Sequence, residues 1–78
     1  MSRSVFNWTA EDATRFLKEH GFVLNHTRGS HIYYVGRYGK MLRQVCVPFH
    51  GSKVLKPRTL KGIIHQSGIP RPEWLKQS

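Results

Sequence analysis

Carboxylates are scarce in this chain. Its 78 residues include 4 Asp and Glu against 13 Lys and Arg, which gives a formal net charge of +9. No carboxylate lies between Glu19 and Glu73, and that interval carries most of the cations: Arg28, Arg37, Lys40, Arg43, Lys53, Lys56, Arg58, Lys61 and Arg71. Such a charge balance favours an anionic partner, whether a nucleic acid, an acidic protein or an anionic membrane surface.

The same scarcity argues against one class of nuclease. An enzyme that works through two metal ions needs several carboxylates clustered around those ions. Here Glu11, Asp12 and Glu19 belong to one segment near the N-terminus, and Glu73 lies near the C-terminus. We therefore expect no metal site and no cofactor.

Cysteines and long apolar runs are also rare. Cys46 is the only cysteine, so an internal disulfide and a thiolate metal cluster are excluded, and its Val-Cys-Val setting predicts a small buried side chain. No apolar run is long enough to cross a bilayer, and the first residues lack the pattern of a secretory signal. We expect a soluble cytoplasmic protein without membrane association.

Two amphipathic segments predict helices within a single domain spanning residues 1–78. Residues 9–20 open with a Thr-x-x-Asp capping pattern and are followed by glycine. Residues 57–67 start with proline and are also followed by glycine. After Pro72 two outcomes are open: one further turn that brings Trp74 and Leu75 onto the core, or a frayed end.

Three segments between these helices predict strands. They cover residues 22–27, 31–35 and 41–47, and polar glycine-containing turns separate them. A polar loop over residues 49–56 then leads to the second helix. The order α-β-β-β-α predicts an α+β, dsRBD-like fold in which two helices pack on one face of a three-stranded antiparallel sheet.

The alternation of side chains in the second strand leaves one question open. His31, Tyr33 and Val35 share one face, while Ile32 and Tyr34 share the other. Both faces contain residues suited to a core, so the pattern does not decide which face is exposed to solvent.

His31 is the candidate catalytic residue. Without a metal, the economical route to cleave a phosphodiester uses the 2′-hydroxyl of RNA as nucleophile and a general base to take its proton. Histidine suits that task because its side chain ordinarily titrates at about pH 6.5. From the residues alone, a structural role for His31 is the more common alternative, and a non-catalytic RNA-binding module is the alternative function.

Other side chains are secondary candidates. His50 in the loop and Tyr33 are candidate helpers, and His26, expected diagonal to His31, is a weaker one. Free backbone amides at the start of the second helix, with nearby cations, suit RNA phosphates. An acidic protein covering the same surface is the alternative. The cations predicted to bind phosphate are Arg28, Lys53, Lys56, Arg58 and Lys61.

The aromatic residues divide into core and surface candidates. Tyr34 is expected in the core, whereas Tyr38, in a predicted turn over residues 36–40, is freer to contact a ligand. Trp8 and Trp74 are expected to lie in the core or to cover its edge.

Three blocks of sequence carry a resemblance to a known family. They are Phe16–Phe22, Arg28-Gly29-Ser30-His31 leading to Tyr34, and Val47–Gly51 continuing through Leu55–Pro57, Thr59-Leu60 and Gly68-Ile69. In this order and spacing the chain resembles the HicA family of toxins that cleave messenger RNA. The resemblance implies a small ribonuclease with mRNA as substrate, a single catalytic histidine at His31, and inhibition by a HicB-type antitoxin.

Departures from the family pattern occur at three positions. Ile32 stands where many members have a second histidine, Arg58 where they often have glycine, and Val54 where they often have an acid. His31 itself is unaffected by these changes.

Overall fold

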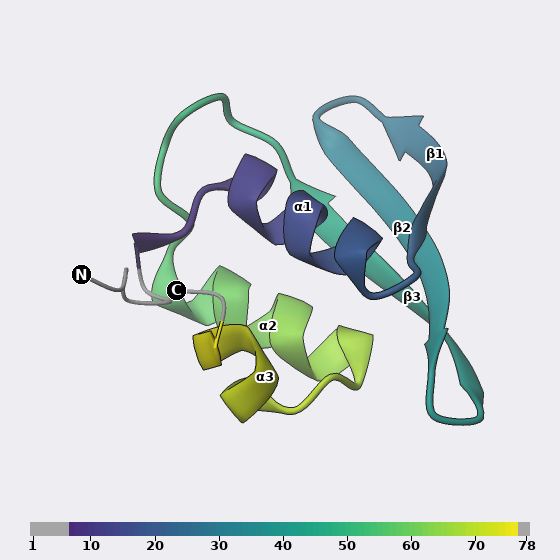
Figure 1. Cartoon of the computed structure of the whole chain (residues 1–78). Helices are drawn as coiled ribbons and strands as arrows, with labels where there is room; N and C mark the ends of the chain where they lie inside the picture. Colours follow the sequence, from purple (N-terminus) through teal and green to yellow (C-terminus); the bar gives the residue numbers. More distant parts are fainter. Residues whose placement is uncertain (1–6, 77–78) are drawn as a thin grey trace.

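A computed structural model describes residues 7–76, so both ends of the predicted 1–78 domain lie outside the described residues. The sheet has the strand order β1-β2-β3 with antiparallel pairing, which confirms the predicted α+β, dsRBD-like fold. No helix within residues 7–76 is long and apolar enough to span a membrane. The elements in chain order are α1 (Ala10–Glu19), β1 (Val23–Arg28), β2 (His31–Tyr38), β3 (Met41–Pro48), α2 (Pro57–Ser67) and α3 (Arg71–Lys76) (Figure 1).

The ends of the two long helices follow from local sequence. The Thr9 hydroxyl accepts a hydrogen bond from the Asp12 amide (3.2 Å), and the Asp12 carboxylate accepts one from the Thr9 amide (2.9 Å), completing a capping box. Gly21 and Gly68 follow α1 and α2 with positive φ angles of 87° and 73°, which glycine adopts without steric cost. Both helices were predicted to within one residue of each end.

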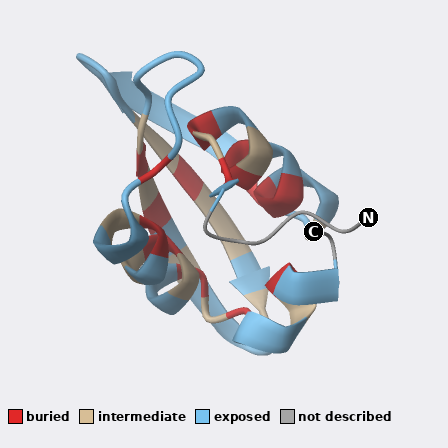
Figure 2. Cartoon of the chain, turned by 90° about the vertical axis from the view of Figure 1, so that its left-hand side faces the viewer, coloured by how far each residue is buried: buried red, intermediate tan, exposed pale blue. Residues whose placement is uncertain are grey.

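Burial shows which face of the sheet is covered. Tyr34 is buried and Ile32 packs against the core on the helix side, so alternation places His31, Tyr33 and Val35 on the opposite, open face. Buried residues line the inner sides of α1 and α2, whereas β1 is exposed along its length (Figure 2). The largest buried side chains are Trp74, Phe16, Phe22, Leu17, Leu60, Ile63, Ile69, Val45 and Val47.

The second strand is longer than predicted. We expected it to end at Val35 and a turn to cover residues 36–40, but β2 continues to Tyr38. Gly36 lies inside the strand because the Phe22 ring packs on its backbone: a Cβ added there would stand 2.6 Å from Phe22 Cγ. The glycine that suggested a turn therefore makes room for a core aromatic side chain.

Three side-chain predictions were wrong. Tyr38 packs against the core instead of standing free in a turn, because it belongs to the helix-facing row of β2. Cys46 is half-buried on the open face, since its neighbours Val45 and Val47 take the core positions of β3. In α3, Trp74 is fully buried as expected, but Leu75 is 48% exposed.

A candidate active site beside a basic pocket

His31 is the first residue of β2 and stands on the open face of the sheet. The preceding turn begins with Gly29, whose φ of 59° suits the first central position of a two-residue hairpin turn. Arg28 on β1 and Pro48 on β3 pair with His31 from the two sides. The His31 side chain is exposed, and within residues 7–76 it forms no hydrogen bond to another side chain. Both of its ring nitrogens are therefore available to a ligand.

His20 shows what a structural histidine looks like in this chain. Its Nδ1 lies 2.9 Å from the Phe16 carbonyl oxygen, and its ring stacks on Phe16 at a centroid distance of 4.1 Å. These contacts give His20 a structural role at the C-cap of α1. His31 makes no comparable contact within residues 7–76.

The loop over residues 49–56 is held in place at both ends. At its start, the Phe49 amide donates a hydrogen bond of 2.7 Å to the Ser30 carbonyl, in the turn just before His31. At its end, the Leu55 amide donates one of 2.8 Å to the Trp8 carbonyl, and Val54 forms an isolated bridge with Thr9. The loop therefore leaves the sheet next to His31 and returns to α2 along a defined path.

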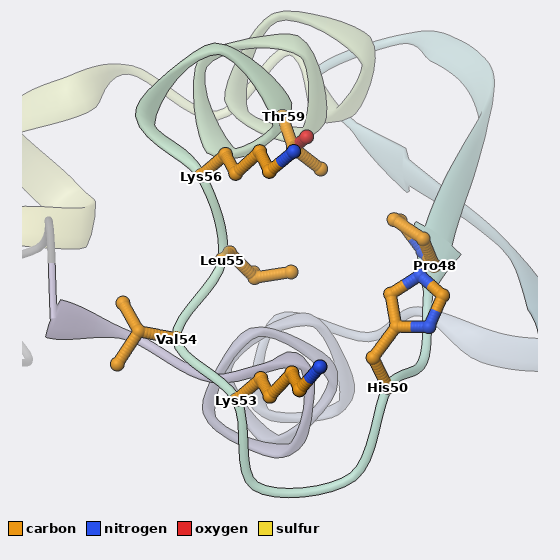
Figure 3. Close-up of a pocket in the computed structure, with 7 residues that line it drawn as sticks. All are labelled: Pro48, His50, Lys53, Val54, Leu55, Lys56 and Thr59. Carbon is orange, nitrogen blue, oxygen red and sulfur yellow. The ribbon is translucent and has the colours of Figure 1, made fainter.

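A pocket of about 430 Å³ lies between this loop and the start of α2. In Figure 3 the side chains of Lys53 and Lys56 extend on either side of Leu55 toward the side where Pro48 and His50 stand. Pro48 is also the cross-strand partner of His31, so the pocket begins one strand away from the candidate catalytic residue. The lining residues are Pro48, His50, Lys53, Val54, Leu55, Lys56 and Thr59.

The pocket lining carries two lysines and no carboxylate. The carboxylates of Glu11, Asp12 and Glu73 pair with Arg15 and Lys76 on α1 and α3, away from the pocket lining. At the start of α2 the N-cap residue Lys56 makes no side-chain capping bond, and no acid occupies the first turn. The helix amides at this end are therefore open to an anion as well as to water.

The structure groups the predicted site residues in two adjoining places. Arg28, His31 and Tyr33 share the open face of the sheet, and His50, Lys53 and Lys56 line the pocket that begins at Pro48. Two further predicted phosphate-binding residues stand outside the pocket lining on exposed positions of α2, namely Arg58 and Lys61.

Tyr33 has an altered titration. A hydrogen bond with the Cys46 side chain raises the pKa of the Tyr33 hydroxyl above its ordinary value of 10.0, and the nearby Arg28 opposes this rise. The hydroxyl therefore stays protonated at neutral pH. Tyr33 therefore suits the donation of a hydrogen bond, and it does not suit the role of a base.

Ile32 lies on the other side of the sheet from His31. It packs against the core cluster, as the alternation of β2 requires. The replacement of a family histidine by isoleucine at this position therefore leaves the open face around His31 unchanged.

Four residues of the pocket lining were not among the predicted site residues: Pro48, Val54, Leu55 and Thr59. Leu55 forms an apolar part of the lining and is itself 6% exposed, while Thr59 contributes a hydroxyl from the first turns of α2. A lone leucine in a polar loop was a usable signal for Leu55, because such a residue is commonly buried. Within residues 7–76, no three His, Cys, Asp or Glu side chains are grouped so as to hold a metal ion.

Comparison with known proteins places this architecture in a family. A search of curated proteins found no match. A family model described as the HicA toxin of bacterial toxin-antitoxin systems matches residues 10–69, from the start of α1 to just beyond α2. The matched segment includes His31 and the whole pocket lining, and it spans well over half of the chain. The chain therefore belongs to the HicA family, and it is the toxin of a toxin-antitoxin system.

Proposed function

We propose that this toxin is a metal-independent endoribonuclease that cleaves mRNA in the cytoplasm with His31 as its acid-base group. The observation that carries the proposal is the position of His31: an exposed imidazole that forms no side-chain hydrogen bond within residues 7–76, one strand from a basic pocket. Membership of the HicA family supports the same assignment.

The chemistry follows from an imidazole and the substrate's own hydroxyl. His31 takes the proton of a 2′-hydroxyl, and the oxygen attacks the adjacent phosphorus. The bond from phosphorus to the 5′-oxygen of the next nucleotide then breaks, and that oxygen receives a proton. The products are a 2′,3′-cyclic phosphate and a 5′-hydroxyl. His50 in the pocket is the candidate proton donor, and Tyr33, whose raised pKa keeps its hydroxyl protonated, is a candidate helper that donates a hydrogen bond.

Positive charge near His31 suits a phosphodiester backbone. Arg28 pairs with His31 across the strands, while Lys53 and Lys56 extend along the pocket. Lysine and arginine contacts to phosphate supply affinity and orientation without reading the bases. The exposed Arg58 and Lys61 extend the cationic surface along α2.

Inhibition by an antitoxin uses the same surface in this proposal. A toxin of this family is paired with an antitoxin, and we assign that role to a HicB-type protein. No carboxylate lies between Glu19 and Glu73, so the surface around the pocket is complementary to an acidic partner. An antitoxin seated there would keep RNA away from His31.

Cleavage should require the 2′-hydroxyl and no divalent metal. We expect the purified toxin, free of antitoxin, to cut single-stranded RNA in excess EDTA and to leave 2′,3′-cyclic phosphate ends. The same sequence with 2′-O-methyl groups throughout should stay intact, because its nucleophile is blocked. Gel electrophoresis and mass spectrometry of the ends measure both results.

Two outcomes would contradict this scheme in different ways. Cleavage that appears only when Mg²⁺ is added would overturn the metal-independent mechanism. RNA that stays intact with and without Mg²⁺, although the toxin binds it, would favour the non-catalytic RNA-binding module.

Removal of the two pocket lysines should weaken RNA binding and reduce its salt dependence. For single strands the slope of log K against log salt is about −0.7 per phosphate contact, so Lys53→Ala with Lys56→Ala should reduce its magnitude by about 1.4. Titration of a 2′-O-methyl oligonucleotide at several salt concentrations measures this slope. A charge-matched control combines Lys18→Ala with Lys40→Ala, on the last turn of α1 and in the β2–β3 turn. Equal slopes for the two double variants would rule out the pocket as a phosphate site.

A further inference from the structure

The open face carries a pair of stacked rings beside His31. The His26 and Tyr33 rings lie 4.4 Å apart between centroids with an interplanar angle of 10°. The two residues pair directly across β1 and β2, and the strand register shifts just before His26. The Asn25 side-chain nitrogen lies 2.9 Å from His26 Nδ1, which limits rotation of the imidazole. Tyr33 in turn has Cys46 of β3 as its other cross-strand partner.

The stack lies close to the candidate catalytic residue. His26 pairs with Tyr33 and Arg28 pairs with His31, so His26 is the diagonal neighbour of His31 on the same face. Diagonal neighbours in an antiparallel pair have Cα atoms about 7–8 Å apart. Arg28 lies two residues from His26 on β1 and directly opposite His31 on β2. It is also near enough to Tyr33 to influence the titration of its hydroxyl.

One side of the stack is open. β1 is an edge strand, and all 6 of its residues are exposed. Tyr33 occupies one face of the His26 ring, which leaves the other face turned toward the free edge of the sheet. A planar group can approach that face without displacing a side chain of the core.

We propose that the His26–Tyr33 stack is a platform for one unpaired nucleobase of the RNA, next to the linkage cleaved at His31. This assignment rests on the proposed function. An aromatic ring beside a positive charge is how proteins hold single-stranded nucleic acid, with the base on the ring and the phosphate on the cation. Here Arg28 supplies the charge between the platform and His31. The platform accepts any base, because every base has a π-face.

His26 is therefore a substrate-positioning residue. It holds a nucleotide while His31, two cross-strand pairs away along the hairpin, faces the 2′-hydroxyl. A purely structural stack would contribute to the hairpin without contacting RNA. The two roles differ in their response to the base, so the test compares ligands with and without bases.

The test uses a single-stranded 2′-O-methyl oligonucleotide, which lacks the reactive hydroxyl, so its outcome does not depend on catalysis. We expect His26→Ala to weaken binding by about 5- to 150-fold, the range for loss of one stacked base. His26→Phe, which keeps a planar ring, should bind within about threefold of the unmodified toxin by the same reasoning. A 2-aminopurine placed in turn at each position should be quenched at one position, and His26→Ala should abolish that quenching.

An abasic oligonucleotide provides the matched control. His26→Ala should leave its affinity unchanged, whereas Lys53→Ala should weaken the abasic and base-containing strands equally. Thermal unfolding followed by circular dichroism checks that each variant is folded. Unchanged affinity of folded His26→Ala for the base-containing strand, or an equal loss for both strands, would overturn the platform. Neither result bears on cleavage at His31, which the uncleavable strand does not report.

Discussion

Replacement of His31 by alanine should lower the rate of RNA cleavage by about 10²- to 10⁴-fold, the usual contribution of a positioned acid-base group. The side chain is exposed and makes no side-chain hydrogen bond within residues 7–76, so its removal should leave the free energy of unfolding nearly unchanged. Single-turnover cleavage of a labelled RNA in EDTA measures the rate, and urea denaturation measures the stability.

Two further variants make this result specific to the imidazole. His31→Gln keeps a polar side chain without an acid-base function, so it should be as inactive as the alanine variant while binding 2′-O-methyl RNA normally. His65→Ala removes an exposed histidine from the last turn of α2 and should cleave at the unmodified rate. Cleavage by His31→Ala as fast as by the unmodified toxin would remove His31 from the mechanism.

The helices and hairpins were predictable because their determinants are local. Thr9 and Asp12 are three residues apart, and α1 and α2 are each followed by a glycine that can adopt a positive φ. The same kind of signal misled at Gly36. There the glycine is needed because the ring of Phe22, a residue of another segment, packs against its backbone. Local patterns therefore located the ends of elements well and failed where a contact distant in sequence decides the backbone.

The candidate site was predictable as a set of residues but not as an arrangement. The stretch without carboxylates between Glu19 and Glu73 and the position of His31 led to the proposed chemistry, whereas period-two alternation did not tell which face is open. That required the burial of Tyr34 and the packing of Ile32. The pocket depends on hydrogen bonds from Phe49 and Leu55 to distant backbone carbonyls, which no local pattern encodes.

His26 was undervalued for a related reason. Its diagonal position relative to His31 was predicted and is confirmed by the strand register. Its stacking on Tyr33 depends on the side-chain orientations of both residues. As a second catalytic group His26 was a weak candidate, whereas the stacked pair is the basis for the substrate-positioning role that we propose for it.

The largest effect on stability is expected at Trp74 in α3. This residue is fully buried, stacks on Phe16 at 3.9 Å between ring centroids and lies 5.5 Å from the Trp8 ring. Its indole nitrogen donates a hydrogen bond of 3.2 Å to the Ile69 carbonyl, which joins α3 to the segment after α2. Truncation of a buried tryptophan to alanine costs about 3–5 kcal/mol. The free energy of unfolding of a domain is about 0.05–0.15 kcal/mol per residue, so for 78 residues this loss is a large part of the total free energy of unfolding.

Trp74→Ala should therefore populate the unfolded state, and its residual cleavage should follow the folded fraction. Urea denaturation should show a midpoint lowered by about 3–5 M for a slope near 1 kcal/mol/M, or no folded baseline at all. Lys76→Ala, which removes an exposed ion pair with Glu73 from the same helix, should shift the stability by less than about 1 kcal/mol. If Trp74→Ala were no less stable than Lys76→Ala, α3 would be dispensable to the core. The contrast with His31→Ala is the informative one, because that variant should lose cleavage while folded and Trp74→Ala should lose it only to the extent that it unfolds.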